Sequence, residues 1–296
     1  MQLDKRENWM GLEIPSIWNG YTIEALLRDV WQVPKKQLHQ IRMDKGVLVN
    51  NEQKRWSETL SEGDYLEAQV FIPEESDVIP DKKNVQILFE DDHILVANKP
   101  AGMDTHPNEK GQTGTLLNAV THHCGPHTNV RHIHRLDRDT TGAVLFAKHR
   151  IAGSIMDRLL EERKVKRAYL ALVHGLVSKK KGTIDQAIGK DRHHATRKRV
   201  SPKGQSAVTD YEVHGYLKEK NATLVKLFLK TGRTHQIRVH MSHIGHPLLG
   251  DSLYGGKKNA APRQALHAAS LTFPHPFTGE TITSEAPFID EPPIFE

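Results

Sequence analysis

The first 78 residues show two kinds of apolar pattern, helical and then extended. Apolar side chains recur every three or four positions between residues 22 and 31, which predicts a helix. Pro34 suits the first turn of a second helix. Apolar runs at 47–50 and 65–70 then predict two strands. The order of these elements predicts a small α/β module over residues 1–78.

A segment that mixes proline with charged residues, 72–84, follows this module and suits a linker. Beyond it, apolar runs at 85–89 and 93–97 flank Glu90-Asp91-Asp92, which predicts a β-hairpin. We therefore expect a second and larger domain over residues 79–296.

The larger domain mixes helical and extended patterns at irregular spacing. Thr115 suits the N-cap of one helix, and a second is expected over 151–160. Strands are expected at 143–148, 169–173 and 223–230. This arrangement predicts an α+β domain built on a mixed, largely antiparallel sheet flanked by helices.

The composition is that of an ordinary soluble globular protein, with 37% hydrophobic and 26% charged residues. No apolar run approaches the roughly 18 residues that span a bilayer, and no apolar stretch follows the charged N-terminus as in a signal peptide. The single cysteine, Cys124, excludes an internal disulfide and suits a reducing compartment. We therefore expect a cytoplasmic protein without membrane contact, with a monomer as the default state.

The formal net charge of +5 is unevenly distributed along the chain. Residues 1–80 carry 9 basic and 14 acidic side chains, so their net charge is −5 and that of the remainder is +10. Residues 158–203 alone hold 14 basic against 4 acidic side chains. Such a concentrated positive field attracts a polyanion. A solvated helical face followed by a basic loop explains the same composition equally well.

The densest polar cluster runs from His134 to Gly142, directly before the strand expected at 143–148. It contains two carboxylates, Asp137 and Asp139, with arginines beside them. An adjacent cation favours an ionised carboxylate, which suits catalysis. On composition alone, an exposed loop whose charges neutralise one another is the simpler interpretation.

A second cluster, Thr-Gly-Arg-Thr-His-Gln-Ile-Arg, starts at Thr231 after the last expected strand. Strand, turn and helix would place Arg233 near the helix start, with His235 and Arg238 on one helical face. The planar fork of arginine suits either a phosphate or a carboxylate. A structural ion pair fits the pattern equally well.

Together, these segments resemble the RluA/RluC/RluD-type RNA pseudouridine synthases. The matching motifs, in the order in which that family has them, are Asn98–Gly102, His106-Pro107, His134–Asp137 with Asp139–Gly142, Lys166–Gly175, Thr231–Arg238, Gly245-His246-Pro247, Gly250–Gly255 and Leu266-His267-Ala268. The resemblance covers roughly residues 85–290. The module at residues 1–78 resembles an S4-like RNA-binding domain in its helix-helix-strand order.

The family resemblance implies specific roles. It marks Asp137, rather than Asp139, as the essential catalytic residue, with Arg238 as its ionic partner. It implies that Tyr169 packs on the uracil and takes part in proton removal. It also implies that Arg135 replaces the flipped-out base or braces the RNA around it.

The implied partner is a structured RNA, with ribosomal RNA favoured over tRNA. The candidate RNA-contacting residues are Arg135, Arg138, His134, Arg233 and His235. Pseudouridine forms when the bond from ribose C1′ to uracil N1 breaks and C1′ joins C5. Nothing is oxidised and no group is imported, so neither a cofactor nor a metal ion is expected.

Three other functions compete with this interpretation. A metal enzyme would have to use a histidine-rich stretch that lacks any metal motif: His122, His123, Cys124, His127, His132 and His134. A non-catalytic RNA-binding or RNA-folding protein would need the basic tract but not Asp137, Tyr169 and Arg238 together. A glycosidase normally needs two cooperating carboxylates, and Asp139 is the near neighbour of Asp137.

Overall fold

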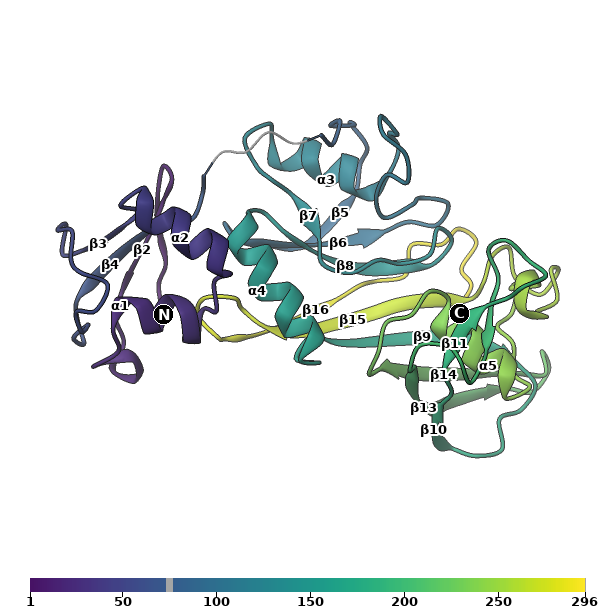
Figure 1. The fold of residues 1–296 in the computed structure, drawn as a ribbon. Coiled ribbons are helices and arrows are strands. Elements are labelled where there is room, and N and C mark those ends of the chain that lie inside the picture. The colour runs from purple at the N-terminus through teal and green to yellow at the C-terminus, as the bar shows by residue number, and fades with distance from the viewer. Residues whose placement is uncertain (73–76, 296) are drawn as a thin grey trace.

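The structure is a computed structural model that describes residues 1–72 and 77–295. Residues 73–76 of the expected linker lie outside the described residues. The strands in the described ranges form a four-stranded, a ten-stranded and a two-stranded sheet. Figure 1 shows the small sheet at one end of the molecule and the large sheet extending away from it.

The N-terminal module confirms the expected helices and strands and adds two strands before them. Its elements are β1 Asp4–Arg6, β2 Trp9–Glu13, η1 Ser16–Trp18, α1 Ile23–Ala25, η2 Leu26–Val30, α2 Lys35–Met43, β3 Val47–Val49 and β4 Tyr65–Gln69. The sheet order is β1-β2-β4-β3. The central strand β2 was not predicted from the sequence. Its apolar residues are interrupted by Gly11, which lies against the Tyr65 ring.

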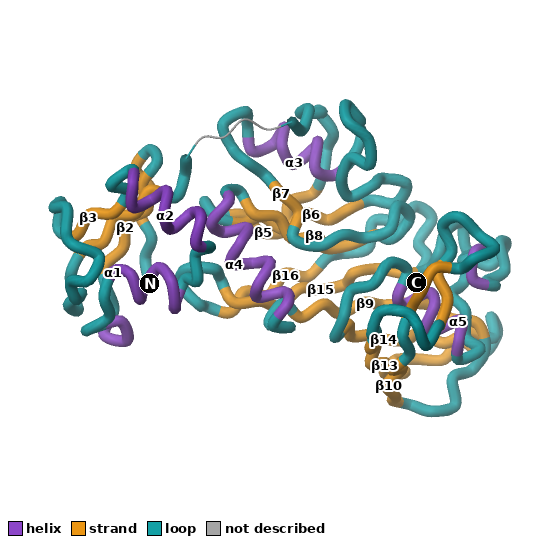
Figure 2. The backbone as a smooth tube through the Cα atoms, viewed as in Figure 1, coloured by secondary structure: helices purple, strands orange, loops and turns teal. Residues whose placement is uncertain are grey.

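The larger part of the chain has the expected α+β architecture. Its strands are β5 Gln86–Glu90, β6 Ile94–Lys99, β7 Arg131–His132, β8 Thr141–Ala147, β9 Lys166–His174, β10 Lys181–Asp185, β11 Ile188–Lys190, β12 Lys198–Val200, β13 Val208–Leu217, β14 Ala222–Leu229, β15 Leu266–Pro274 and β16 Thr281–Glu285. Its helices are α3 Leu116–Cys124, α4 Arg150–Glu161, α5 Gln236–His243 and η3 Ser252–Tyr254. In Figure 2 α4 lies between the N-terminal module and the long strands, whereas α3 and α5 lie farther from the module.

The large sheet is mixed and largely antiparallel, which confirms the predicted fold class. Its main order is β10-β13-β14-β9-β15-β8-β6-β5, and the pairing of β8 with β15 is parallel. β5 and β6 form the expected hairpin. The strands that were not predicted from the sequence are β7, β10, β11, β12, β13, β15 and β16. In β13 the reason is physical, because the strand is only half buried and contains a bulge before Gly215, so its apolar pattern is weak.

Both faces of β6 and β8 are covered, which explains their continuous apolar sequences. In β8, Val144 and Phe146 pack in the cluster that contains α3 residues, while Ala143 and Leu145 pack in the cluster that contains α4 residues. This alternation follows the two-residue period of a strand. The resulting rigid sheet carries the polar loop that ends at β8.

The N-terminal module and the large sheet share one hydrophobic cluster. The Trp31 ring meets the Phe277 ring edge to face, with 5.2 Å between centroids. Arg158 of α4 also donates to the carbonyl of Gln32 at 3.2 Å. The division into domains at residues 1–78 and 79–296 stays a prediction. No helix in the described ranges is long and apolar enough to cross a membrane.

Candidate active site

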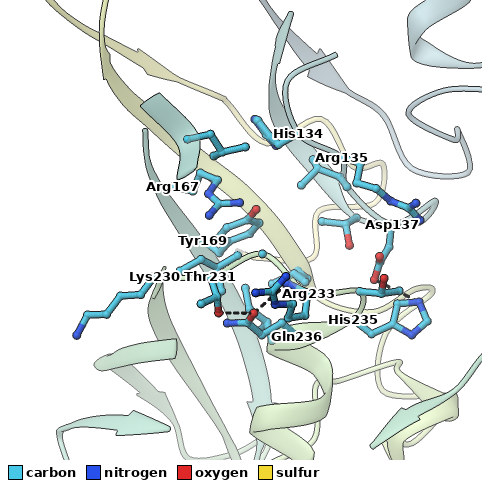
Figure 3. A pocket seen from close by; sticks show the side chains of 18 of the residues that line it. His134, Arg135, Asp137, Arg167, Tyr169, Lys230, Thr231, Arg233, His235 and Gln236 are labelled. Atoms are coloured by element: carbon cyan, nitrogen blue, oxygen red, sulfur yellow. Dashed lines mark hydrogen bonds and ion pairs between the residues drawn. The ribbon is translucent and has the colours of Figure 1, made fainter. Parts of the chain in front are cut away.

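The polar loop before β8 lines a cavity of about 630 Å³. That volume lies within the roughly 300–1,000 Å³ typical of ligand sites. The other walls come from the end of α4, from β9 and from the turn between β14 and α5. Figure 3 shows Asp137 and Arg135 on the loop, with Tyr169 and Arg167 on the strand across from them. Segments from four regions of the chain therefore meet around Asp137.

Asp137 is held by an arginine that also binds a second carboxylate. Arg238 Nη1 donates to Asp137 Oδ2 at 3.0 Å. The same guanidinium binds Asp251 with both Nε and Nη2, at 2.7 and 2.9 Å. The Asp251 side chain is only 1% exposed, whereas that of Asp137 is 19% exposed. Asp251 therefore anchors Arg238, and Arg238 presents Asp137 to the cavity.

These ion pairs change the pKa of the arginine. Burial lowers the pKa of Arg238, but hydrogen bonds to Asp251 and the charges of both aspartates outweigh burial and raise the pKa above its ordinary value. Arg238 therefore keeps its positive charge at physiological pH. Its guanidinium also lies over the Tyr254 ring, 5.0 Å from the centroid.

The start of α5 places Arg238 and His235 beside Asp137. His235 is the N-cap residue and has a left-handed backbone with φ of 58°. Its Nε2 lies 3.8 Å from Asp137 Oδ2, and its Nδ1 lies 2.8 Å from the Tyr254 hydroxyl. Burial lowers the pKa of His235, against the opposing effect of Asp137. His235 therefore lies outside the helix that was predicted to carry it together with Arg238, but both side chains approach Asp137.

Gln236 fixes the turn that leads into α5. Its Oε1 accepts from Thr231 Oγ1 at 2.8 Å and from Arg233 N at 3.0 Å. Its Nε2 donates to Val208 O at 3.0 Å and to Thr209 Oγ1 at 2.9 Å. These bonds join the turn to β13 and orient the helix that carries Arg238.

Tyr169 forms the floor of the cavity from the middle of β9. Its side chain is largely buried, and burial raises the pKa of its hydroxyl. Ile237 and Leu266 line the same cavity. An aromatic ring with apolar neighbours provides a surface on which a flat base can stack.

The structure separates the five candidate RNA-contacting residues into two groups. Arg135, Arg138 and Arg233 are exposed, and His235 lies at the cavity wall. Arg138 Nε donates to the carbonyl of Gly102, and Arg233 Nε to that of Ser206. Arg135 has no hydrogen-bond partner within residues 1–72 and 77–295. These exposed cations have the chemistry needed to bind phosphate.

His134 differs from these residues because its ring is buried. Its Nε2 accepts a hydrogen bond from Leu145 N at 3.2 Å. Burial lowers the pKa of the ring to about 3, so the ring is neutral at physiological pH. This geometry supports a structural role in the loop, and RNA contact by His134 stays a prediction.

Two site residues escaped the sequence analysis. Asp251 and Tyr254 lie in the quoted Gly250–Gly255 motif, but nothing in their spacing connected them to Arg238 or His235. Their role depends on the fold, which brings η3 and its flanks against α5. The feature of the sequence that could have indicated them is the position of Asp251 and Tyr254 beside the glycines of this motif.

Histidines of the stretch considered as a possible metal site, residues 122–134, contact protein side chains instead. His123 Nε2 lies 2.7 Å from Glu90 Oε2, and the His132 ring stacks on that of His106 with 4.4 Å between centroids. Among the described residues, no group of three or more His, Cys, Asp and Glu is arranged to hold a metal ion.

Comparisons with known proteins agree with this geometry. A family model described as RNA pseudouridylate synthase matches residues 93–243, and one described as RluD ribosomal pseudouridine synthase N-terminal domain matches residues 10–66. "Uncharacterized RNA pseudouridine synthase YhcT" of Bacillus subtilis is 46% identical over 273 residues, which are 91% of this chain and 90% of that protein.

Two further relatives extend the comparison. "Ribosomal large subunit pseudouridine synthase D" of Haemophilus influenzae is 40% identical over 247 residues, covering 77% of this chain and 75% of that protein. The solved structure of human RNA Pseudouridylate Synthase Domain Containing 1 has a TM-score of 0.58 at 30% identity. The match covers 73% of this chain and 86% of that chain.

Proposed function

The chain belongs to the RNA pseudouridylate synthase family and is an isomerase that converts uridine in RNA to pseudouridine. From that premise we propose that Asp137 is its catalytic residue and that ribosomal RNA is its substrate. The observation that supports the first part most strongly is the Asp137–Arg238–Asp251 arrangement at the cavity wall.

Asp137 has the geometry that a catalytic carboxylate needs. Its Oδ2 is bound by Arg238, while its Oδ1 has no hydrogen-bond partner within the described part of the chain. The bound cation stabilises the negative charge, and the second oxygen remains available to a substrate. Attack at ribose C1′ and removal of a ribose proton both require such a carboxylate.

The rest of the cavity suits the isomerisation. The target base must leave its stack, which costs about a few kcal/mol. We propose that the uracil stacks on Tyr169 and that Arg135 fills or braces the gap in the RNA. The C1′–N1 bond breaks, the base turns, and C1′ joins C5. The C5 hydrogen leaves and N1 gains a proton, so no metal ion or redox cofactor is required.

The proposed substrate class follows from the relatives. The Haemophilus influenzae protein is named for the large ribosomal subunit, and the N-terminal family model is described as ribosomal. We propose that the S4-like module at residues 1–78 adds RNA contacts through exposed lysines of α2, Lys35 and Lys36, and that the protein acts as a monomer.

Tritium release from RNA labelled at uridine C5 tests both proposals, because forming the new bond expels the C5 hydrogen. Wild type and Asp137→Asn would be compared on ribosomal RNA and on tRNA. We expect release from ribosomal RNA by wild type and none by the variant.

Asp139→Asn is the matched control, because it removes a carboxylate from the same loop. We expect this variant to retain release. Release that survives in Asp137→Asn would exclude Asp137 as the catalytic residue. Release from tRNA alone would instead exclude the proposed substrate class.

A further inference from the structure

Buried donors hold the backbone immediately around Asp137. The Thr105 hydroxyl bonds to both Leu136 N and Leu136 O, at 3.0 and 2.9 Å. Lys99, which is fully buried, donates through Nζ to the carbonyl of Arg138 at 2.7 Å. The residues before and after Asp137 are therefore tied to the end of β6 and to the segment that follows it.

Arg263 binds the backbone of Asp139, the next residue of the loop after Arg138. Its Nη1 donates to the carbonyl of Asp139 at 3.0 Å, and its Nη2 donates to Thr141 Oγ1 at 2.9 Å. Nη1 also donates to the carbonyls of Gln264 and Leu266, at 2.7 and 3.0 Å. The Arg263 side chain is only 7% exposed. One guanidinium therefore joins the polar loop, the start of β8 and the start of β15.

The charge of Arg263 is balanced by a residue close to the C-terminus. Asp290 accepts from Arg263 Nε at 2.8 Å and from Nη2 at 2.7 Å, and its side chain is 9% exposed. The same C-terminal segment is fastened a second time, because His267 Nε2 lies 2.9 Å from the carbonyl of Ala286 and His267 Nδ1 lies 2.8 Å from Thr141 Oγ1. Ala286 and Asp290 are thus linked, through His267 and Arg263, to the loop that carries Asp137.

We propose that Arg263, oriented by Asp290, is a positioning residue for Asp137. The bidentate pair fixes the plane of the guanidinium, which sets the position of the Asp139 carbonyl two residues after Asp137. Asp137 must meet both Arg238 and the substrate, and a misplacement of about 1 Å is enough to lower a rate by about 100-fold. The C-terminal segment is thereby part of the support of the active site. This inference rests on the proposed role of Asp137.

The acceptors of Arg263 explain why loss of the Asp290 charge would displace Asp137. Apart from Asp290 they are three main-chain carbonyls and one hydroxyl, which bind the cation without neutralising it. Removal of the Asp290 charge leaves a buried cation, which must find another carboxylate or water. Asp139 is the carboxylate of the loop that Arg263 already contacts through its backbone. A shift of Asp139 toward Arg263 would turn the loop and move Asp137.

The experiment measures kcat and KM for tritium release by full-length Asp290→Asn and Arg263→Lys, on the RNA that wild type uses. Assays are run well below each variant's unfolding temperature, and the folded fraction is measured by circular dichroism. We expect kcat to fall by about 10- to 100-fold with KM changed less than about threefold. Glu291→Gln, which removes the adjacent exposed charge, is the matched control and keeps the wild-type kcat.

Asp290→Glu covers the case in which Asp290→Asn does not fold. It keeps the charge and moves the carboxylate by one methylene, so kcat falls while the protein remains folded. A wild-type kcat per folded molecule in Arg263→Lys and in Asp290→Glu would overturn the inference. If Asp137→Asn were inactive at the same time, the proposed function would stand. Release by Asp137→Asn would instead overturn the proposed function itself.

Discussion

At the active site Arg238 lies between Asp137 and Asp251, whereas at the junction of the N-terminal module with the large sheet His93 and His149 lie among aromatic rings. Both clusters contain titratable side chains from segments that are distant in the chain. The first keeps full charges and pairs them beside an open cavity. The second is closed, and burial lowers the pKa of His93 to about 4 and that of His149 well below its ordinary value.

The hydrogen bonds at the junction show how its rings stay neutral. His149 Nδ1 accepts from Ala152 N at the start of α4, so its proton lies on Nε2. That Nε2 then donates to His93 Nδ1 at 3.0 Å. The rings of Phe71 and Phe277 pack against both histidines. A proton added at either acceptor nitrogen would break one of these bonds.

This difference between the two clusters indicates whether a substitution in each of them affects catalysis or stability. A charge is retained beside the cavity because paired charges can act on a substrate there. At the closed junction desolvation suppresses the positive charge of the two histidines, whereas Asp91 beside them keeps its negative charge. Changes to the charged cluster should therefore affect catalysis first, and changes to the junction should affect stability first.

Arg238→Met should have the largest effect. It leaves Asp251 buried without its partner, so we expect the free energy of unfolding to fall by about 3–5 kcal/mol. We also expect tritium release to fall by at least about 100-fold, because Asp137 loses its cation. Urea unfolding and release assays measure the two effects. Arg238→Lys is the paired variant, and full activity in it would show that charge alone is sufficient.

Phe277→Ala should be almost as destabilising but should leave catalysis intact. Its ring contacts those of Trp31, His93 and His149, so its removal opens a cavity that costs about 3–5 kcal/mol. We expect an unchanged kcat at temperatures at which the variant is folded. A loss of kcat under those conditions would break the distinction between the two clusters.

Acid should destabilise the junction through protonation of His93. The pKa of His93 is about 4 in the folded state, lowered by burial against the opposing charge of Asp91, and its ordinary value is 6.5. Between these values the unfolded chain binds more protons, so stability is complete above pH 6.5 and decreases as the pH falls toward 4. The loss from this one group is about 3 kcal/mol, because one pKa unit corresponds to about 1.4 kcal/mol.

Urea unfolding between pH 4 and 7 measures how the free energy of unfolding changes with pH. His93→Phe removes one titrating group from the junction, and its stability should depend less steeply on pH than that of wild type. Equal slopes in the two proteins would show that other groups cause the acid sensitivity.

Lys5→Met should have the smallest effect. Lys5 pairs with Asp92 across the junction at 3.0 Å, but both side chains are about half exposed. Exposed ion pairs contribute less than about 1 kcal/mol, and salt screens them. We expect a small loss of stability that disappears in high salt, measured by thermal unfolding. A larger or salt-independent loss would place Lys5 in the buried part of the junction.

The sequence by itself determined some of the local elements of the large sheet and of the helices beside it. Apolar runs on either side of Glu90-Asp91-Asp92 predicted the β5–β6 hairpin, and Thr115 predicted the cap of α3. The order of strand, Thr-Gly turn and helix predicted α5, which carries Arg238. These features depend on neighbours a few residues apart, which a sequence records directly. The resemblance of the motifs to the pseudouridine synthases marked Asp137 as the catalytic candidate.

Only the tertiary structure decided the partners of those residues. Asp251 and Asp290 are 114 and 153 positions from Asp137 in the chain, and neither was assigned a role from sequence. The half-buried β13 was missed because its apolar pattern is weak, and the central β2 because Gly11 interrupts its apolar residues. Whether a buried charge is paired or a buried histidine is neutral depends on which groups the fold brings within a few ångströms. Coulomb and desolvation energies follow distance and burial, and neither is written in the order of residues.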